Sequence, residues 1–308
     1  MAGYDLGEVT SFKGIAEGVE NTNFLIETTR NRYILTIYEK RVDQKELPFF
    51  LNLMGHLALK GLNCPTPVLD KSGNNLNQLS GKPAALVTFL EGLSVRRPKI
   101  EHCAQLGRSM AEMHLAGRDY DAARANKLSI EGWQDLNQKV EEQTDSISPG
   151  LKTLISNELD FLKDHWPDNL PSGIIHADLF PDNVFFLGQK LSGLIDFYFA
   201  CTDAFAYDIA ICMNAWCFEA HNEFNATKAR QMLSHYTASR PLNKNEYEAL
   251  PILCRGAALR FLLTRVYDWL NTPENALVRP KNPDEYIAKL RFHQGIKSAA
   301  EYGLAPIT

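Results

Sequence analysis

The segment HADLFPDN, residues 176–183, gathers polar side chains between two apolar runs. Asp178 and Asn183 are five positions apart, and Asp196 ends the apolar run LID thirteen positions after Asn183. The intervening sequence VFFLGQKLSGLIDF has two apolar runs around a polar turn, which is typical of a β-hairpin. Such a hairpin would return the chain and bring Asp196 beside Asn183. The spacing therefore predicts that oxygen atoms of Asp178, Asn183 and Asp196 converge.

These oxygen atoms are suited to phosphoryl transfer from a magnesium-bound nucleotide. Carboxylate and amide oxygens are the hard ligands of Mg²⁺, which takes further ligands from phosphates. We therefore expect Asn183 and Asp196 to bind the metal of Mg-ATP. Asp178 would orient an attacking hydroxyl, for which an ordinary pKa suffices because the transition state is loose. His176 is expected to hydrogen-bond backbone near this loop. Turn or capping roles would explain each residue alone, but not the combined spacing.

The surrounding sequence predicts two lobes of different character. Clusters of β-branched and aromatic residues predict strands over 9–13, 23–28 and 33–38, and a further strand over 83–92 runs into a hinge. A helix is expected over 47–62. Helical patterns then dominate, over 100–116, 131–143, 150–165, 205–220, 225–239, 245–270 and 284–302. The expected class is α+β, with a small antiparallel-sheet lobe over 1–91 and a larger, mainly helical lobe over 92–308.

The amino-acid composition of the chain argues against several kinds of binding partner. The net charge of −5 offers no general basic surface, which argues against a nucleic-acid partner. No apolar run approaches the roughly 20 residues that span a bilayer, and MAGYDLGEVTSFKG does not resemble a signal peptide. We therefore expect a cytoplasmic protein without a membrane partner, acting on a small molecule; the oligomeric state stays open. The six cysteines form no CxxC pair and are expected to be reduced and buried.

These motifs resemble those of the aminoglycoside-phosphotransferase and choline-kinase-like superfamily, which has the two-lobed fold of the protein kinases. HADLFPDN resembles its catalytic loop and LIDF its metal-binding segment. EGVENTNFLIET, YILTIYEKR and GLIDFYFACTDAFAYDIAICMNAWCFE resemble the homoserine kinases of this superfamily, and the likeness covers about residues 4–304. The resemblance implies transfer of the γ-phosphoryl group of ATP to the side-chain hydroxyl of L-homoserine, a step toward threonine.

The resemblance also implies where the nucleotide binds. The turn AEGVENTN would cover the phosphates, although it contains neither GxGxxG nor GxxxxGK[ST], and an ordinary hairpin turn is the alternative. Its expected contacts are Gly18, Glu20, Asn21 and Thr22. The segment FLEG, residues 89–92, would be the hinge, where backbone groups of Phe89 and Glu91 bind the adenine edge.

One nucleotide contact departs from the superfamily pattern. Thr36 occupies the position where many members place a lysine that contacts the α- and β-phosphates, and threonine carries no charge. Glu46 lies where the partner glutamate of that lysine would lie, and a solvated acid at a helix start is the alternative. Lys13, Lys40 or Arg41 could supply the charge. An inactive nucleotide-binding module would tolerate this loss, but the intact aspartates and asparagine favour an enzyme.

The acceptor site should contain a fixed cation, because homoserine carries a carboxylate besides its ammonium group. CRGAALRFLLTRVYDWL is apolar nearly all round and contains arginines at 255, 260 and 265. Steps of five turn a helix by about 140°, so at least one arginine faces inward. Arg260 and Arg265 are the candidates for substrate binding. Ion pairs with Asp268 or Asp208 are the structural alternative.

Residues shortly after Asp196 complete the predicted site. Tyr198 and Asp203 are expected to line the acceptor pocket. Asn214 and Trp216 are further candidates, although core packing is favoured for Trp216. Asp208 matches a position of the superfamily that braces the catalytic loop, so the resemblance implies a structural role for it.

Two other acceptors are compatible with the catalytic motif. Choline would require an aromatic box around its quaternary ammonium, and an aminoglycoside would require an acidic face. A homoserine site should instead present an arginine.

Overall fold

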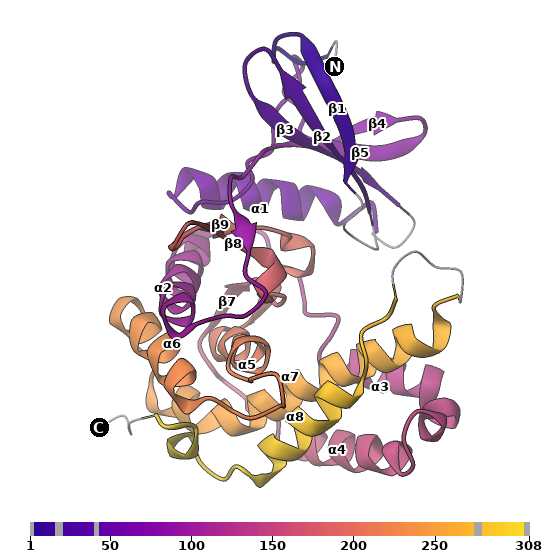
Figure 1. Cartoon of the computed structure of the whole chain (residues 1–308), viewed down its shortest axis with the longest axis vertical. Helices are drawn as coiled ribbons and strands as arrows, with labels where there is room; N and C mark the ends of the chain where they lie inside the picture. The colour runs from indigo at the N-terminus through magenta and orange to yellow at the C-terminus, as the bar shows by residue number, and fades with distance from the viewer. Residues whose placement is uncertain (1–2, 16–20, 40–42, 274–278, 305–308) are drawn as a thin grey trace.

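The computed structural model describes residues 3–15, 21–39, 43–273 and 279–304. A twisted antiparallel sheet forms one end of the molecule, and helices form the other end (Figure 1). The predicted α+β class, with an N-terminal sheet and a helical C-terminal part, is confirmed.

The N-terminal sheet has the strand order β1-β2-β3-β5-β4, and all its neighbouring strands are antiparallel. The strands are β1 Val9–Ile15, β2 Asn21–Thr28, β3 Arg32–Tyr38, β4 Asn77–Leu79 and β5 Lys82–Thr88. The predicted meander of the first three strands is confirmed. The strand expected over 83–92 ends earlier, at Thr88. β4 was not predicted because its three residues, NQL, give no apolar alternation.

Helix α1, Leu47–Leu59, lies between the sheet and the other helices (Figure 1). Its apolar side chains belong to one continuous core that extends through the helical part of the chain. The sheet has its own small cluster of buried residues, formed by Ile26, Tyr33 and Leu86. Although α1 precedes most of the helical part in sequence, it is therefore anchored mainly to that part.

Short strands frame the motif HADLFPDN. The predicted hairpin is formed by β8 Val184–Leu187 and β9 Lys190–Leu194, which are antiparallel. β6 Leu93–Ser94 pairs with β8, and β7 Ser172–Ile175 pairs with β10 Cys201–Ala204. The strands β6, β7 and β10 were not predicted because each has at most four residues. Together they hold the motif between two small ladders.

The helical part follows the predicted order closely. Its helices within the described ranges are α2 Ile100–Ala116, α3 Ile130–Val140, α4 Leu151–His165, α5 Phe205–Trp216, α6 Ala226–Ser239, α7 Lys244–Asn271 and α8 Asp284–Gly295. The helix expected over 284–302 is wrong in its second half. Ile296 is extended, and Ser298 caps a separate 3₁₀ turn, Ala299–Tyr302.

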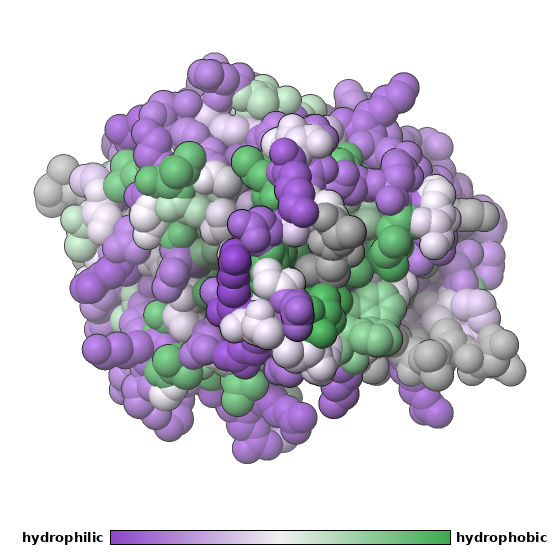
Figure 2. Space-filling view, turned by 90° about the horizontal axis from the view of Figure 1, so that it is seen from above, coloured by the Kyte–Doolittle hydropathy of each residue, from purple (hydrophilic) through white to green (hydrophobic). Residues whose placement is uncertain are grey.

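All six cysteines are free and buried, as predicted from the sequence. The face seen in Figure 2 is mostly hydrophilic, with scattered hydrophobic residues. None of the helices in the described ranges is long and apolar enough to cross a membrane.

Close packing of α2 against α6 can be tested at Gly107. A Cβ atom there would lie 2.0 Å from the carbonyl oxygen of Met232, a backbone atom that cannot rotate away. We expect Gly107→Ala to lower the free energy of unfolding by about 1–3 kcal/mol, measured by urea denaturation. Gly55→Ala in α1 is the matched control, because nothing lies within 4 Å of its added Cβ. It should be neutral or stabilise by up to about 1 kcal/mol. Equal effects at both sites would contradict this account.

Candidate active site

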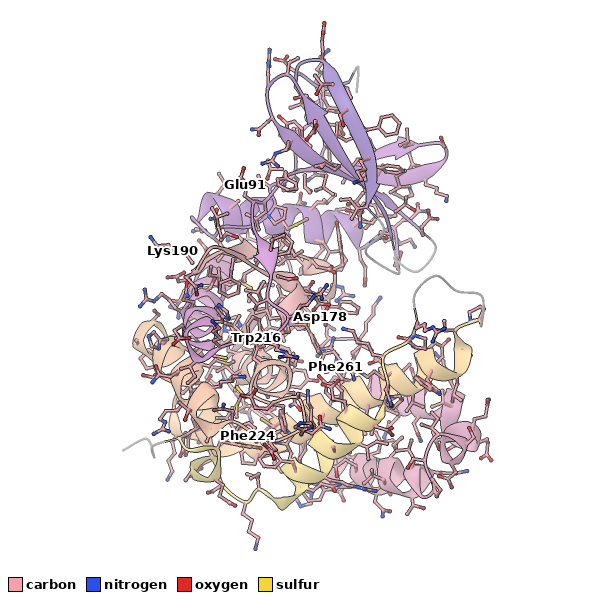
Figure 3. All side chains as sticks on the ribbon, viewed as in Figure 1. Glu91, Asp178, Lys190, Trp216, Phe224 and Phe261 are labelled. Atoms are coloured by element: carbon pink, nitrogen blue, oxygen red, sulfur yellow. The ribbon has the colours of Figure 1, made fainter. Side chains whose placement is uncertain are left out.

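Asp178 and Asn183 are joined directly in the loop between β7 and β8. The side-chain nitrogen of Asn183 donates to the backbone oxygen of Asp178 at 2.8 Å and to its Oδ2 at 3.1 Å. Figure 3 shows Asp178 below the sheet and α1, at the top of the helical part. Both bonds of Asn183 use its nitrogen, so its amide oxygen is the atom left to face a cation.

The hairpin returns the chain to this loop as predicted. The amide of Ile195 donates to the carbonyl of Asn183 at 3.0 Å, and the carbonyl of Ile195 faces Nε2 of His176 at 2.9 Å. Asp196 follows with φ of 64°, in the left-handed region that aspartate tolerates. The backbone role predicted for His176 is confirmed. The structure thus brings the segments of Asp178, Asn183 and Asp196 together, while their chemical roles stay predictions.

Burial governs the charge of Asp178. Desolvation raises the pKa of this carboxyl to about 8, although the positive charge of Arg260 opposes the shift; the negative charge of Asp196 adds to it. The ordinary pKa expected from the sequence is therefore not found, because the burial of Asp178 depends on how the chain folds around it. A divalent cation bound beside Asp178 would favour its ionised form.

Asp208 on α5 braces the catalytic loop, as predicted. Its Oδ2 accepts from the amide of His176 at 3.0 Å, and its Oδ1 accepts from the amide of Ala177 at 2.9 Å. Nε2 of His114 lies 3.0 Å from Oδ2. Burial alone would raise the pKa of Asp208, but the hydrogen bond with His114 and neighbouring donors hold it below the usual value. Burial also lowers the pKa of His114, so the pair is a carboxylate and a neutral imidazole.

The inward-facing arginine of α7 is Arg260. Its side chain is 1% exposed, and Nη1 donates to the carbonyl of Ala177 at 2.7 Å. Ala177 itself has a left-handed φ of 62°. Its amide and carbonyl are therefore both held, by Asp208 and by Arg260. Phe261, which packs its ring 4.6 Å from the guanidinium, lies below Asp178 in Figure 3.

The other two arginines of α7 are paired elsewhere. Arg255 makes two 2.7 Å bonds to Glu158. Arg265 bonds Glu285 at 2.7 Å and the carbonyl of Asn282 at 3.0 Å. The structure therefore does not bring Arg265 to the catalytic loop. The distant Glu285 could not be foreseen as its partner.

A cavity of about 260 Å³ lies beside the catalytic loop. It is lined by Asp43, Glu46, Phe50, Arg124, Asn126, Lys127, Leu128, Tyr198, Phe199 and Arg260. Tyr198 was predicted here, whereas the segment 124–128 was not, because it shows no periodic pattern. Asp203 lies just behind the wall and accepts from Asn126 at 2.7 Å.

Two further candidates for this pocket belong to the core instead. Asn214 and Trp216 are both fully buried. The amide of Asn214 bonds the carbonyls of Ala210 and Cys254, and the indole of Trp216 donates to the carbonyl of Leu179 at 2.6 Å. Trp216 therefore supports the catalytic loop from below (Figure 3).

Glu46 turns away from the sheet. Its carboxylate lies 2.9 Å from Nη2 of Arg124 and 2.6 Å from Nζ of Lys127. Burial would raise the pKa of Glu46, but hydrogen bonds from these cations lower it. Glu46 was expected where the partner glutamate of the sheet lysine would lie. In the structure it pairs instead with Arg124 and Lys127, which belong to the helical part.

Neutral hydrogen bonds occupy the place of the expected lysine. Thr36 is buried, and its hydroxyl donates to the side-chain oxygen of Asn23 at 2.8 Å. The hydroxyl of Tyr198 lies 2.7 Å from that of Tyr38, which joins the segment after Asp196 to β3. This pair of hydroxyl groups thus links the sheet to the segment that follows Asp196.

The predicted phosphate contacts are only partly described. Asn21 and Thr22 begin β2, and the hydroxyl of Thr22 donates to Glu39 at 3.2 Å. Gly18 and Glu20 lie outside the described residues. Lys40 and Arg41, considered as substitute cations, also lie outside them, while Lys13 is exposed on β1.

The predicted hinge needs one correction. The amide of Phe89 donates to the carbonyl of Arg32 at 3.2 Å, so the sheet already uses it. The guanidinium of Arg32 lies 4.4 Å from the ring centroid of Phe89 and 2.6 Å from the carboxylate of Glu91. The carbonyl of Phe89 and the backbone of Glu91 therefore remain as candidates for the adenine edge.

The fold and the loop define a phosphotransferase with a protein-kinase-like architecture. Residues 11–242 match the model of the phosphotransferase enzyme family, and the chain belongs to that family. A homoserine kinase from Xanthobacter autotrophicus is 61% identical over 99% of this chain and 95% of its own length. A homoserine kinase from Azorhizobium caulinodans is 58% identical over the same shares of both chains.

Solved structures give the same architecture at low identity. The amicoumacin kinase hAmiN, in complex with AMP-PNP, Ca²⁺ and Ami, has a TM-score of 0.69 at 16% identity, covering 95% of this chain and 90% of that one. Choline kinase from Cryptosporidium parvum has a TM-score of 0.68 at 14% identity, covering 92% and 88%. These similarities show the two-lobed kinase fold alone.

The brace at Asp208 yields a prediction about stability and turnover. In Asp208→Asn an amide nitrogen replaces one of two acceptor oxygens that face buried N–H donors. We expect a loss of about 1–3 kcal/mol in the free energy of unfolding, measured by urea denaturation, because a buried donor is left without an acceptor. Turnover should fall in the fraction that stays folded. Asp160→Asn, the same change at an exposed position of α4, is the control and should alter neither quantity. Unchanged stability in Asp208→Asn would contradict the brace.

Proposed function

We propose that this protein is an ATP-dependent homoserine kinase that transfers the γ-phosphoryl group to the side-chain hydroxyl of L-homoserine. The observation that carries the proposal is the position of Arg260, a buried guanidinium that lines a small cavity and whose charge acts on the carboxyl of Asp178. Homoserine has the carboxylate that such a guanidinium binds. The identity of 61% to a homoserine kinase over nearly the whole chain supports the same acceptor.

The donor atoms of Asn183 and Asp196 suit Mg²⁺. One residue offers an amide oxygen and the other a carboxylate, and both are hard ligands. We assign the metal site to this pair. When bound, Mg²⁺ would neutralise charge on the phosphates of ATP.

The nucleotide itself is assigned to the sheet. Thr36, the start of β2 at Asn21 and Thr22, and backbone groups of Phe89 and Glu91 are the proposed contacts among the described residues. The turn that contains Gly18 and Glu20 is assigned to the phosphates on the resemblance alone.

Asp178 is assigned to the acceptor hydroxyl. The hydroxyl oxygen forms a bond to the γ-phosphorus while the bond from that phosphorus to the β–γ bridging oxygen breaks. The hydroxyl proton passes to the carboxylate of Asp178, and ADP leaves. Asn183, which bonds both the carbonyl and the carboxylate of Asp178, holds the base in orientation.

The carboxylate end of the acceptor is assigned to the part of the cavity that Arg260 lines. Arg260 would bind the carboxylate, with the hydroxyl of Tyr198 in the same wall. Asp203 would act through Asn126, whose amide it holds. Arg265 is not retained in this role because Glu285 pairs with it.

Choline fits this cavity poorly. Three aromatic residues line it, but Arg124 lies 4.9 Å from the ring centroid of Phe50, and Arg260 lies 5.8 Å from that of Phe199. Guanidinium groups thus already contact two of the ring faces that a quaternary ammonium would need. A second cation there would be repelled.

A coupled ADP-release assay tests the acceptor. We expect homoserine to stimulate ADP formation well above serine, threonine and choline, because only homoserine combines the carboxylate with the longer hydroxyl arm. Preference for choline would refute the role of Arg260. Stimulation by none of them, with ATP binding retained, would indicate a nucleotide-binding module without turnover.

Asp178→Asn tests the catalytic role. The variant keeps the shape of the side chain but cannot accept the proton, so kcat should fall by about 10²–10⁴-fold. Affinity for AMP-PNP, measured by calorimetry, should stay nearly unchanged. Asp182→Asn is the matched control, because it makes the same change in the same loop at a side chain that is 63% exposed. Loss of nucleotide binding in Asp178→Asn would instead make Asp178 a metal ligand.

A further inference from the structure

The charged side chains that line the cavity do not all neutralise one another. Arg124 and Lys127 both pair with Glu46. Arg260 and Asp43 are left, and neither forms an ion pair with any residue in the described ranges. Among the described residues, the cavity therefore presents one cation and one anion that form no ion pair with each other or with a third residue.

The cation of the two is deeply buried. Arg260 is 1% exposed, and within the described part of the chain its Nε has no hydrogen-bond partner. Nη1 donates to the carbonyl of Ala177, and the guanidinium also interacts with the side chain of Tyr207. Arg260 interacts with the charge of Asp178 but forms no ion pair with a described residue, so a ligand anion would stabilise this buried guanidinium further.

The carboxylate of Asp43 lines the same cavity. Asp43 precedes α1, and its Oδ1 accepts from the amide of Lys45 at 3.0 Å. This bond fixes the carboxylate at the start of the helix and leaves Oδ2 for another donor. Asp43 thus comes from the N-terminal part of the chain, whereas Arg260 comes from α7.

The other three charged side chains of the cavity, Glu46, Arg124 and Lys127, are joined by ion pairs. The carboxylate of Glu46 is saturated by Arg124 and Lys127, so it does not attract a ligand ammonium. Arg124 is held further by the carbonyl of Ala200 at 3.2 Å, which places its guanidinium as a fixed part of the wall.

We propose that Asp43 and Arg260 form the two poles of a receptor for an α-amino acid zwitterion. Asp43 binds the α-ammonium, and Arg260 binds the α-carboxylate. The inference rests on the proposed function and deepens it, because it makes Asp43 a residue that determines specificity. It also means that the acceptor bridges the N-terminal and helical parts of the protein.

Two analogues of homoserine test the roles of Asp43 and Arg260 separately. 4-Hydroxybutanoate lacks the ammonium, and 3-aminopropan-1-ol lacks the carboxylate, while both keep the hydroxyl. Dissociation constants are measured by calorimetry with AMP-PNP and Mg²⁺ present, and kcat/KM is measured with ATP. In Asp43→Asn, homoserine should bind about 10- to 100-fold more weakly, as expected for loss of a charge-assisted hydrogen bond. Affinity for 4-hydroxybutanoate and the KM for ATP should not change.

Arg260→Lys should give the complementary pattern. It keeps the positive charge but loses the planar fork, so homoserine and 4-hydroxybutanoate should both bind more weakly while 3-aminopropan-1-ol should not. Asp5→Asn removes an exposed carboxylate before β1, outside the residues that line the cavity, and should change none of these values. Asp43→Glu, which keeps the charge, should restore part of the affinity for homoserine.

The outcomes separate the two claims. A wild-type protein that neither binds nor phosphorylates homoserine would refute the proposed function. A wild type that does both, with Asp43→Asn weakening homoserine and 4-hydroxybutanoate equally or weakening neither, would overturn the inference alone. A change confined to the KM for ATP would overturn it as well.

Discussion

The carboxylate of Asp208, buried in the core, accepts hydrogen bonds from the amides of His176 and Ala177. Ala177 can then hold its left-handed backbone, because Arg260 fixes its carbonyl as well. Asp178 comes next in the chain, so its direction is determined by these contacts with the residues before it. The loop that carries Asp178 gains the rigidity of the helical core in this way.

Contacts between the two parts of the molecule replace the lysine–glutamate pair of many kinases. Glu46 pairs with Arg124, and the hydroxyls of Tyr38 and Tyr198 meet at 2.7 Å. Both contacts reach the segment that follows Asp196, since Arg124 also bonds the carbonyl of Ala200. Glu46, Arg124 and Tyr198 also line the cavity described above. The side chains that join the sheet to the helical part therefore also shape this cavity.

Sequence patterns predicted the long elements and the catalytic loop, because apolar periodicity and the spacing of Asp178, Asn183 and Asp196 are local signals. The partners of charged residues were predicted poorly. Arg265 pairs with Glu285, and Glu46 with Arg124, across separations that no periodicity reports. The raised pKa of Asp178 was missed for a related reason, since burial is a property of the assembled core.

Thr36 also has a consequence for chemical probes. Many kinases carry at this position an amine that can react with acylating nucleotide analogues. Here the side chain carries a neutral hydroxyl. Thr36 is 4% exposed, and its hydroxyl donates a hydrogen bond to Asn23. Reagents designed to label that amine would find no nucleophile of the right kind at this point of the sheet. Selective covalent ligands for this protein would have to be directed at another side chain.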